Sequence, residues 1–319
     1  MSQARGTAGQ RSRFCHLCGQ GLAGRYYRYE NGLVCCATCQ ATRPRCARCN
    51  LPLDDASLAR AARAGEPRLC GDCWQSALRC NSCHQPIAGS WTTFEEMLQA
   101  TPVRNFCEQC VRQQPRCDIC RVPVGKGTKA EPDGLYRCER CTATMVREVT
   151  DAHAVYTEAT ARFARLVDAP LRQAPRLEVV SRREMGEVRR RYEQHLHLPS
   201  GEAPGTGSHH VLGFFVAAHG DSAIYVERRL PRQLLLGTLV HELAHAWQAE
   251  YAPGVRDPEL CEGFAEWAAH GALVASGEQH MAARATRRDD LYGRGLRRFL
   301  AAQRTGGRAK ALALARGKV

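Results

Sequence analysis

The segment LLLGTLVHELAHAWQ carries the residues best suited to do chemistry: His241, Glu242 and His245, in the pattern His-Glu-x-x-His. On a helix, residues four apart lie on one face about one turn from each other, so both imidazoles could bind the same metal ion. Glu242 would project to the side of that face, where it could accept a proton from a metal-bound water. Apolar residues surround the motif, and burying uncompensated polar groups among them would be costly, which disfavours a chance pattern on a surface helix. The motif therefore predicts a zinc site with an adjacent general base.

His-Glu-x-x-His is the zinc-peptidase signature, and a catalytic zinc needs a third protein ligand. The metzincin pattern requires a glycine and a histidine where this chain has Gln248 and Tyr251, so that class is excluded. The later segment LCEGFAEWAAH resembles the gluzincin arrangement, in which the glutamate of an E-G-x-A segment completes the site. The resemblance implies that Glu262 is the third ligand and that Glu266, one turn further on, orients a ligating histidine. Glu266 is the alternative third ligand, and a solvated acidic helix face is the alternative for both.

Sixteen of the 18 cysteines form eight C-x-x-C pairs before residue 142, which leaves Cys35 and Cys261 over. We call each C-x-x-C pair a knuckle. Two thiolates from one knuckle and two from a second complete the tetrahedron that structural zinc prefers. The gaps between pairs alternate between six residues and a longer spacing typical of a zinc site, so we expect four structural zinc ions beside one catalytic zinc. The predicted groups are Cys15, Cys18, Cys36 and Cys39; Cys46, Cys49, Cys70 and Cys73; Cys80, Cys83, Cys107 and Cys110; and Cys117, Cys120, Cys138 and Cys141.

A repeat supports this sequential pairing over a crossed one, which the spacing alone leaves open. The copies are RCARCNLPL at 45, RCNSCHQPI at 79 and RCDICRVPV at 116, with FCHLCGQGL at 14 as a looser first copy. Each unit has too little apolar core to fold alone, so zinc binding would supply the missing stability. Disulfides or redox centres are the alternative, and the absence of a secretion signal disfavours them.

A proline followed by an aliphatic residue stands shortly after three of the first knuckles, at 52–53, 86–87 and 123–124. In this the repeat resembles tandem LIM domains, which are protein-interaction modules. The resemblance implies two LIM-like double-zinc modules, at 14–77 and 78–144. The chain uses cysteine throughout and six residues between the units of a pair, so a zinc-ribbon arrangement stays open.

After Thr142 the apolar residues recur every three or four positions, which favours helices. We expect a zinc metallopeptidase domain at 145–305 and a basic tail at 306–319. The fold class predicted is α+β, with small β-hairpins around zinc followed by a mainly helical domain with a small sheet. The expected elements are a helix from Val149 to the break at Ala169–Pro170, a strand at 177–180, a helix at 182–196, a loop at 199–208, a β-hairpin of 211–218 and 223–228, and a helix that begins at Pro231.

The segment 223–265, AIYVERRLPRQLLLGTLVHELAHAWQ followed by CEGFAEW, resembles the peptidase domain of the plant LIM-domain, ubiquitin-activated peptidases that limit organ growth. A strand, an L-P-R turn, HExxHAW and a later E-G follow one another in the same order. The plant proteins carry acidic ubiquitin-interacting helices near the N-terminus, and residues 1–14 contain none, so ubiquitin is a partner without support here. Large gluzincin aminopeptidases share HELAHxW and EGFA but also carry a G-x-M-E-N segment that this chain lacks, which favours an endopeptidase.

These assignments predict a mechanism in which zinc held by His241, His245 and Glu262 activates a water and Glu242 transfers its proton to the leaving amine. The strand at 223–228 is expected beside the cleft, where it could pair with an extended substrate. The candidate donors to the oxyanion are Tyr251, His270 and Tyr292.

Charge and the intact motif help to distinguish the peptidase from two other classes of function. The chain has 45 basic and 32 acidic side chains, a net charge of +13 that could indicate a nucleic-acid binder. Residues 1–141 carry +8 of this charge, and four Zn(Cys)₄ sites of charge −2 each would cancel it. No net positive charge would then remain there to bind phosphates. The second alternative is a catalytically silent zinc scaffold, and the intact Glu242 disfavours it.

The remaining expectations concern location and partners. No apolar run approaches the roughly 20 residues of a membrane span. The first residues lack the apolar region of a signal peptide, so a cytoplasmic protein is expected. Its partners would be a protein or peptide substrate and a protein bound by the zinc modules, with neither nucleic acid nor membrane.

Overall fold

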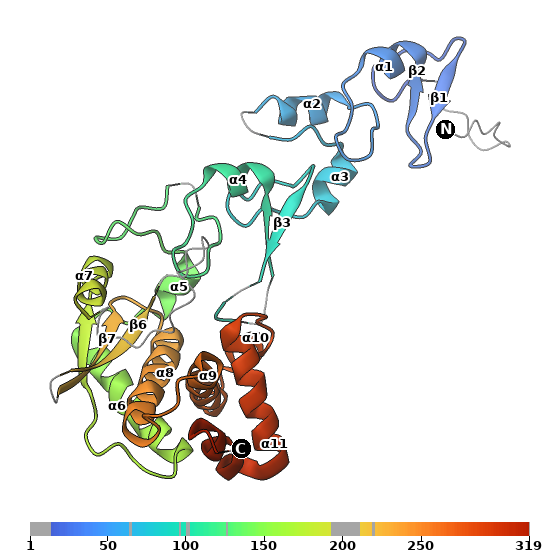
Figure 1. Ribbon diagram of the computed structural model, residues 1–319. Helices are drawn as coiled ribbons and strands as arrows, with labels where there is room; N and C mark the ends of the chain where they lie inside the picture. Colours follow the sequence, from blue (N-terminus) through green and yellow to red (C-terminus); the bar gives the residue numbers. More distant parts are fainter. Residues whose placement is uncertain are drawn as a thin grey trace. The chain divides into compact units, whose positions relative to one another are not determined.

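The computed structural model describes residues 14–63, 66–95, 97–99, 103–125, 127–192, 211–218 and 221–318. Helices and small sheets are mixed, which confirms the α+β class (Figure 1). The chain divides into two compact units, each considered by itself below. The N-terminal unit comprises Met1–Phe94, Val103–Pro115 and Val122–Thr128; the C-terminal unit comprises Glu95–Pro102, Arg116–Arg121 and Lys129–Val319.

The N-terminal unit consists of small cysteine-centred repeats with little apolar core. In the first repeat, Leu17 and Cys35 are buried among the cysteines of the first group. The second repeat buries Leu53 and Leu69 in the same way. Its elements are β1 (Tyr26–Arg28), β2 (Val34–Cys36), α1 (Ala37–Thr42), α2 (Asp55–Ala61), α3 (Gly71–Ser76), β3 (Trp91–Phe94), β4 (Arg104–Cys107) and α4 (Glu108–Gln113), with β1–β2 and β3–β4 paired as antiparallel hairpins.

The residue directly after each first knuckle adopts a left-handed backbone conformation. The four positions are Gly19, Asn50, His84 and Arg121, with φ between 59° and 73°. The turn lets a backbone N–H close back onto the first cysteine of the knuckle, as from Arg121 to the Cys117 carbonyl at 2.9 Å. A shared left-handed turn in all four copies shows that they are one structural repeat, although glycine occupies it only once.

The C-terminal unit surrounds a three-stranded sheet of order β5-β7-β6, in which β5 pairs parallel and β6 antiparallel with β7. Its elements are α5 (Glu139–Ala143), α6 (Val149–Leu166), β5 (Arg176–Val180), α7 (Arg182–Tyr192), β6 (Gly213–Ala218), β7 (Asp221–Glu227), α8 (Arg232–Tyr251), α9 (Pro258–Ala275), α10 (Gln279–Thr286) and α11 (Leu291–Ala315). The predicted hairpin is confirmed, and Pro231 caps α8 one position before its first residue. The loop expected at 199–208 and the end of the helix expected at 182–196 lie outside the described residues.

Close packing fixes the helices that carry the candidate site. A Cβ atom on Gly263 of α9 would lie 2.7 Å from the Gly295 backbone of α11, so only glycine permits this approach. Trp247 of α8, Phe264 of α9 and Phe299 of α11 are fully buried against one another. Because α8 and α9 share this core, side chains on their facing surfaces are held at set distances.

The segment 306–319, expected as a basic tail, is helical through Ala315. The helix α11 breaks at Gly306 and Gly307, where φ of Gly307 is 67°. Beyond the break, Ala311 and Leu312 are buried. Arg316 then binds Asp168 through two hydrogen bonds of 2.6 and 3.0 Å, so this segment packs against the residues that follow α6.

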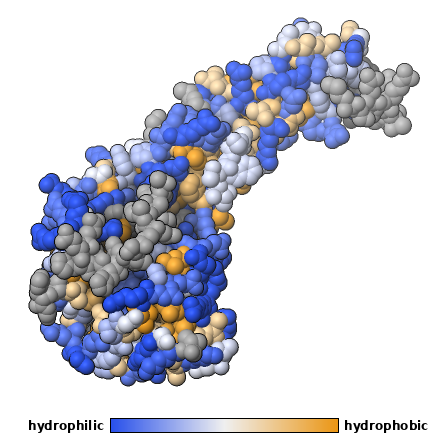
Figure 2. All heavy atoms as spheres, in the orientation of Figure 1, coloured by the Kyte–Doolittle hydropathy of each residue, from blue (hydrophilic) through white to orange (hydrophobic). Residues whose placement is uncertain are grey.

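On the face seen in Figure 2, hydrophilic residues cover most of the surface and hydrophobic residues form small separate patches. Within the described ranges, no helix is both long and apolar enough to cross a membrane.

Candidate metal centres and the adjoining cavity

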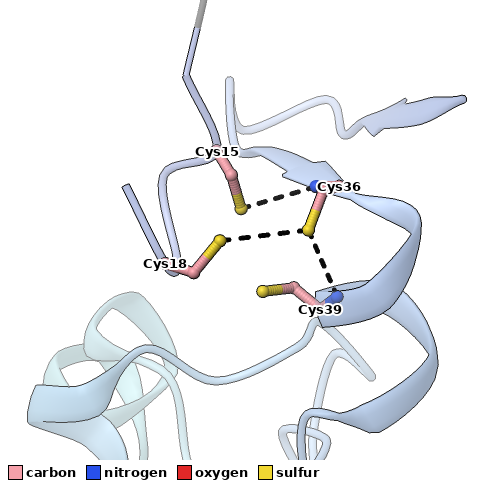
Figure 3. Close-up of side chains that lie close together, drawn as sticks. All are labelled: Cys15, Cys18, Cys36 and Cys39. Atoms are coloured by element: carbon pink, nitrogen blue, oxygen red, sulfur yellow. Dashed lines mark hydrogen bonds between the residues drawn. The ribbon is translucent and has the colours of Figure 1, made fainter. Parts of the chain in front are cut away.

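Four groups of four cysteines lie together, in the sequential pairing expected from the repeat. In the first group, Cys18 and Cys36 come from the two different knuckles and their sulfur atoms are 3.9 Å apart (Figure 3). The corresponding distances in the other groups are 3.6, 3.9 and 3.6 Å. A tetrahedral zinc ion with Zn–S bonds of about 2.3 Å separates its sulfur ligands by about 3.8 Å. All 18 cysteines are free thiols, so the groups could bind a metal such as zinc.

Backbone groups prepare one thiolate in each of the first three groups. Burial raises the pKa of Cys15, but backbone N–H bonds from Cys36 and Leu17, both 3.4 Å long, outweigh it and lower the pKa to about 6. The same balance lowers the pKa of Cys46 to about 6 and that of Cys80 to about 7. Since a metal binds the thiolate, the first cysteine of each of these three groups is prepared for its ligand role.

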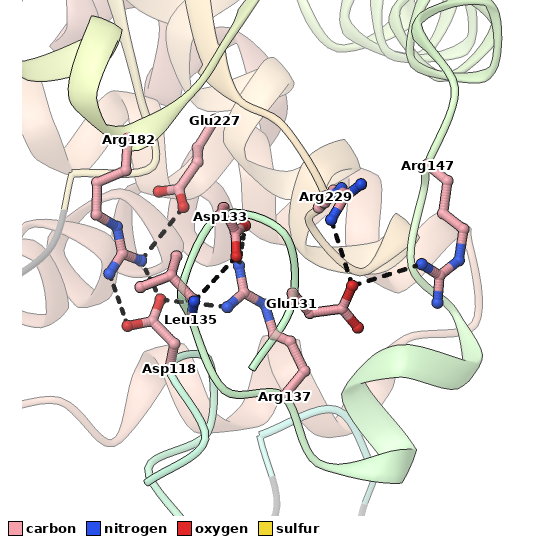
Figure 4. Close-up of polar contacts among 9 residues, drawn as sticks. All are labelled: Asp118, Glu131, Asp133, Leu135, Arg137, Arg147, Arg182, Glu227 and Arg229. Carbon is pink, nitrogen blue, oxygen red and sulfur yellow. Dashed lines mark hydrogen bonds and ion pairs between the residues drawn. The ribbon is translucent and has the colours of Figure 1, made fainter. Parts of the chain in front are cut away.

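The fourth cysteine group belongs to the C-terminal unit. Asp118, inside its first knuckle, accepts two hydrogen bonds from Arg182, the first residue of α7 (Figure 4). Arg182 also reaches the buried Glu227 at the end of β7, at 3.2 Å. One guanidinium thus joins the knuckle to a helix and to the central strand of the sheet.

Further contacts extend this network around the group. Arg137, only 3% exposed, lies 3.5 Å from Asp133 and 3.9 Å from Asp118. Glu131 accepts a hydrogen bond from Arg229, which follows β7 closely, at 3.3 Å. Arg147 lies 3.8 Å from the same carboxylate oxygen. The buried cation beside Cys138 would offset the charge of a Zn(Cys)₄ centre.

Backbone bonds connect the fourth group to the start of α8. Directly after α5, the Val146 N–H donates to the Leu230 carbonyl, and the Arg232 N–H donates to the Thr144 carbonyl, at 2.9 and 2.8 Å. The helix α5 contains Cys141, and α8 carries the His-Glu-x-x-His motif. The backbone just after the cysteine centre is therefore hydrogen-bonded to the start of the helix that carries the histidines.

His241, His245 and Glu262 converge on one point, as expected. The two Nε2 atoms are 3.1 Å apart, and Glu262 Oε2 lies 3.2 Å from that of His241 and 3.5 Å from that of His245. Tetrahedral zinc with bonds of about 2.0–2.1 Å separates its ligand atoms by about 3.3 Å. The three side chains could therefore hold a metal ion, with a fourth position left for another ligand.

The outer nitrogen of each histidine faces an oxygen acceptor. His241 Nδ1 is 3.6 Å from Glu266 Oε1, the position proposed for an orienting carboxylate. His245 Nδ1 is 3.0 Å from Gln248 Oε1, while Gln248 Nε2 donates to the Cys261 carbonyl at 3.1 Å. Such partners set the tautomer that leaves Nε2 free for a metal. Sequence reasoning missed this role of Gln248, although its position three residues after His245 places it on the same helical face.

Glu242 follows His241 on α8, lines the same cavity as the three ligand candidates and is 6% exposed. Burial raises its pKa, with the nearby histidines and a backbone hydrogen bond from Phe215 of β6 acting in the opposite direction. For His241, burial lowers the pKa, but Glu262 and the other two carboxylates outweigh it and raise the pKa to about 9. The same histidines hold the pKa of Glu262 well below its usual range despite its burial. The carboxylates thus favour a cation at this position.

A cavity of about 430 Å³ opens beside the cluster, between β6, α8 and the segment leading into α9. Of the three oxyanion candidates, only Tyr292 lines it, with its ring centroid 6.3 Å from that of His241. Burial and Glu262 raise the pKa of Tyr292 to about 12, so its hydroxyl remains a donor. The Tyr251 hydroxyl instead donates to the Pro170 carbonyl, and His270 is not part of the wall.

The expectation that the strand at 223–228 pairs with a substrate is wrong. That strand is β7, the central strand, and both of its edges are occupied by β5 and β6. The strand β6 pairs on one side only within the described sheet, and residues 213–217 line the cavity. Of the two strands in the hairpin, β6 is therefore the one that an extended chain could join.

Searches of family models, curated proteins and solved structures found no match to this chain.

Proposed function

We propose that this protein is a zinc-dependent peptidase whose N-terminal cysteine modules bind structural zinc and a protein partner. The convergence of His241, His245 and Glu262 next to the buried Glu242, on the wall of a cavity, supports this proposal most strongly. A zinc ion held by these three residues would polarise a carbonyl and lower the pKa of a bound water to about 7.

The chain's own residues have separate roles in the proposed reaction. Glu242 takes a proton from the attacking water and passes it to the leaving amine, a task suited to a buried carboxyl of raised pKa. Tyr292 donates a hydrogen bond to the oxygen that gains negative charge. The backbone of β6 aligns an extended substrate along the cavity.

Glu266 and Gln248 orient the two histidines in this proposal. The arrangement resembles that of gluzincins, with Glu262 as the third ligand, and the cysteine repeat resembles LIM modules. Both resemblances support a protein or peptide as substrate, and the missing G-x-M-E-N segment favours internal cleavage.

A comparison of zinc content and proteolysis tests the proposal. The wild-type chain should contain about five zinc ions, four of them in the cysteine groups. Glu242→Gln should retain all of them and lose cleavage by about 100-fold or more. Glu250→Gln, on the same helix and paired with Arg172, is the matched control and should remain active. Undiminished cleavage by Glu242→Gln would refute the mechanism, while four zinc ions without cleavage would favour a scaffold.

A further inference from the structure

Two arginines in the cavity wall have no ion-pair partner within the described part of the chain. Arg189 is half-buried on α7, and Arg256 is exposed in the segment between α8 and α9. Two other arginines of the unit illustrate the paired state, Arg182 with Asp118 and Arg288 with Asp290. The two arginines come from elements separated in sequence and line the same cavity.

The cavity is cationic once a zinc ion is counted. The charge of Zn²⁺ would be balanced by Glu242 and Glu262, the two carboxylates of the wall. Glu266 lies outside the wall and faces Arg288 at 3.6 Å, so it does not offset the two arginines. The rest of the wall is apolar or neutral, which leaves a net charge of about +2 on the wall once the zinc ion is counted.

Guanidinium groups bind carboxylates through two parallel hydrogen bonds. We propose that Arg189 and Arg256 form a carboxylate-recognition site that selects substrates with an acidic group close to the scissile bond. This inference rests on the proposed peptidase function and names its substrate class. The carboxylate can belong to an Asp or Glu side chain or to a free chain end, and the test separates the two.

The test uses pools of randomised synthetic decapeptides. One pool contains Asp and Glu, a matched pool contains Asn and Gln in their place, and each is made with a free or an amidated C-terminus. Cleavage sites are read by mass spectrometry with the zinc-loaded full chain. We expect about tenfold faster cleavage of the acidic pool, with carboxylates concentrated near the cleaved bond. A preference for the acidic pool that survives amidation assigns the site to side chains, whereas slower cleavage of both pools on amidation assigns it to the chain end.

Arg189→Gln and Arg256→Gln should each remove most of this preference. Both variants should cleave the pool that contains Asn and Gln at a rate within about twofold of the wild type. Arg190→Gln is the matched control, because Arg190 is the exposed neighbour of Arg189 on α7 and does not line the cavity. The preference should also weaken as ionic strength rises. The inference would be overturned if the variants lost cleavage equally on the Asp/Glu pool and the Asn/Gln pool, or if both variants kept the wild-type preference.

A binding measurement separates this inference from the proposed function. Immobilised Glu242→Gln protein is loaded with zinc, and the peptides it retains from the mixed pools are counted by mass spectrometry. Retention enriched in acidic peptides without wild-type cleavage would support the recognition site and contradict the peptidase. Cleavage without acidic preference would do the reverse, and the absence of both would overturn both.

Discussion

The first and fourth cysteine groups share one repeat but have different surroundings. In the first group, Cys18 is exposed, and the neighbouring buried residues all belong to the same small repeat. In the fourth group, three cysteines are buried, and Asp118 in its knuckle is held by Arg182 of α7. The repeat therefore predicts the number of metal centres but not the domain boundary, because the last copy is part of the C-terminal unit.

The largest difference in stability between the two groups should appear when each loses one cysteine ligand. Cys138→Ser should remove one zinc ion and unfold the C-terminal unit, because binding of structural zinc contributes on the order of 10 kcal/mol and this centre is joined to α7, β7 and α8. Cys36→Ser should also remove one zinc ion but leave that unit folded. Zinc analysis and helical circular dichroism during heating measure both effects. Equal loss of helix in the two variants would contradict the comparison.

A smaller effect should come from the carboxylates near each group. Asp118 is 13% exposed and Asp55, which pairs with Arg43, is 80% exposed. Asp118→Asn should destabilise the C-terminal unit by about 3 kcal/mol, since it leaves a partly buried guanidinium with fewer partners. Asp55→Asn should cost less than about 0.5 kcal/mol. Urea unfolding followed by circular dichroism distinguishes them, and similar midpoints for both variants would show that the network around Asp118 is not stabilising.

The smallest effect concerns the left-handed turn after the first knuckle. Arg121→Gly should strengthen the fourth centre by up to about 1 kcal/mol, because glycine adopts this conformation without strain. Gly19→Ala should weaken the first centre by about the same amount, since only the backbone conformation opposes the added methyl group. Competition with a zinc chelator measures both affinities. Changes of the same sign in the two variants would contradict this explanation.

The parts of the site that sequence predicted depend on short spacings. The cysteine groups and the placement of His241 and His245 follow from knuckle and helix geometry, which is local. The membership of the fourth group could not be predicted, because Asp118 and Arg182 are 64 residues apart and their pairing depends on the packing of α7. The order of the strands was equally out of reach, since β7 becomes central only when the distant β5 joins its free edge.

The long separation between Asp118 and its partners also orders events during synthesis. The ribosome adds Arg182 well after the fourth group's last cysteine, and Glu227 a further 45 residues later. At roughly 5–20 residues per second, the knuckle emerges seconds before the side chains that surround it. The ligands of the first group lie within residues 15–39 and those of the fourth within 117–141, so each set emerges together, but the fourth centre gains its surrounding side chains only later. We therefore expect the cysteine centres to form in chain order, and the network around the fourth centre and the histidine site to be completed last.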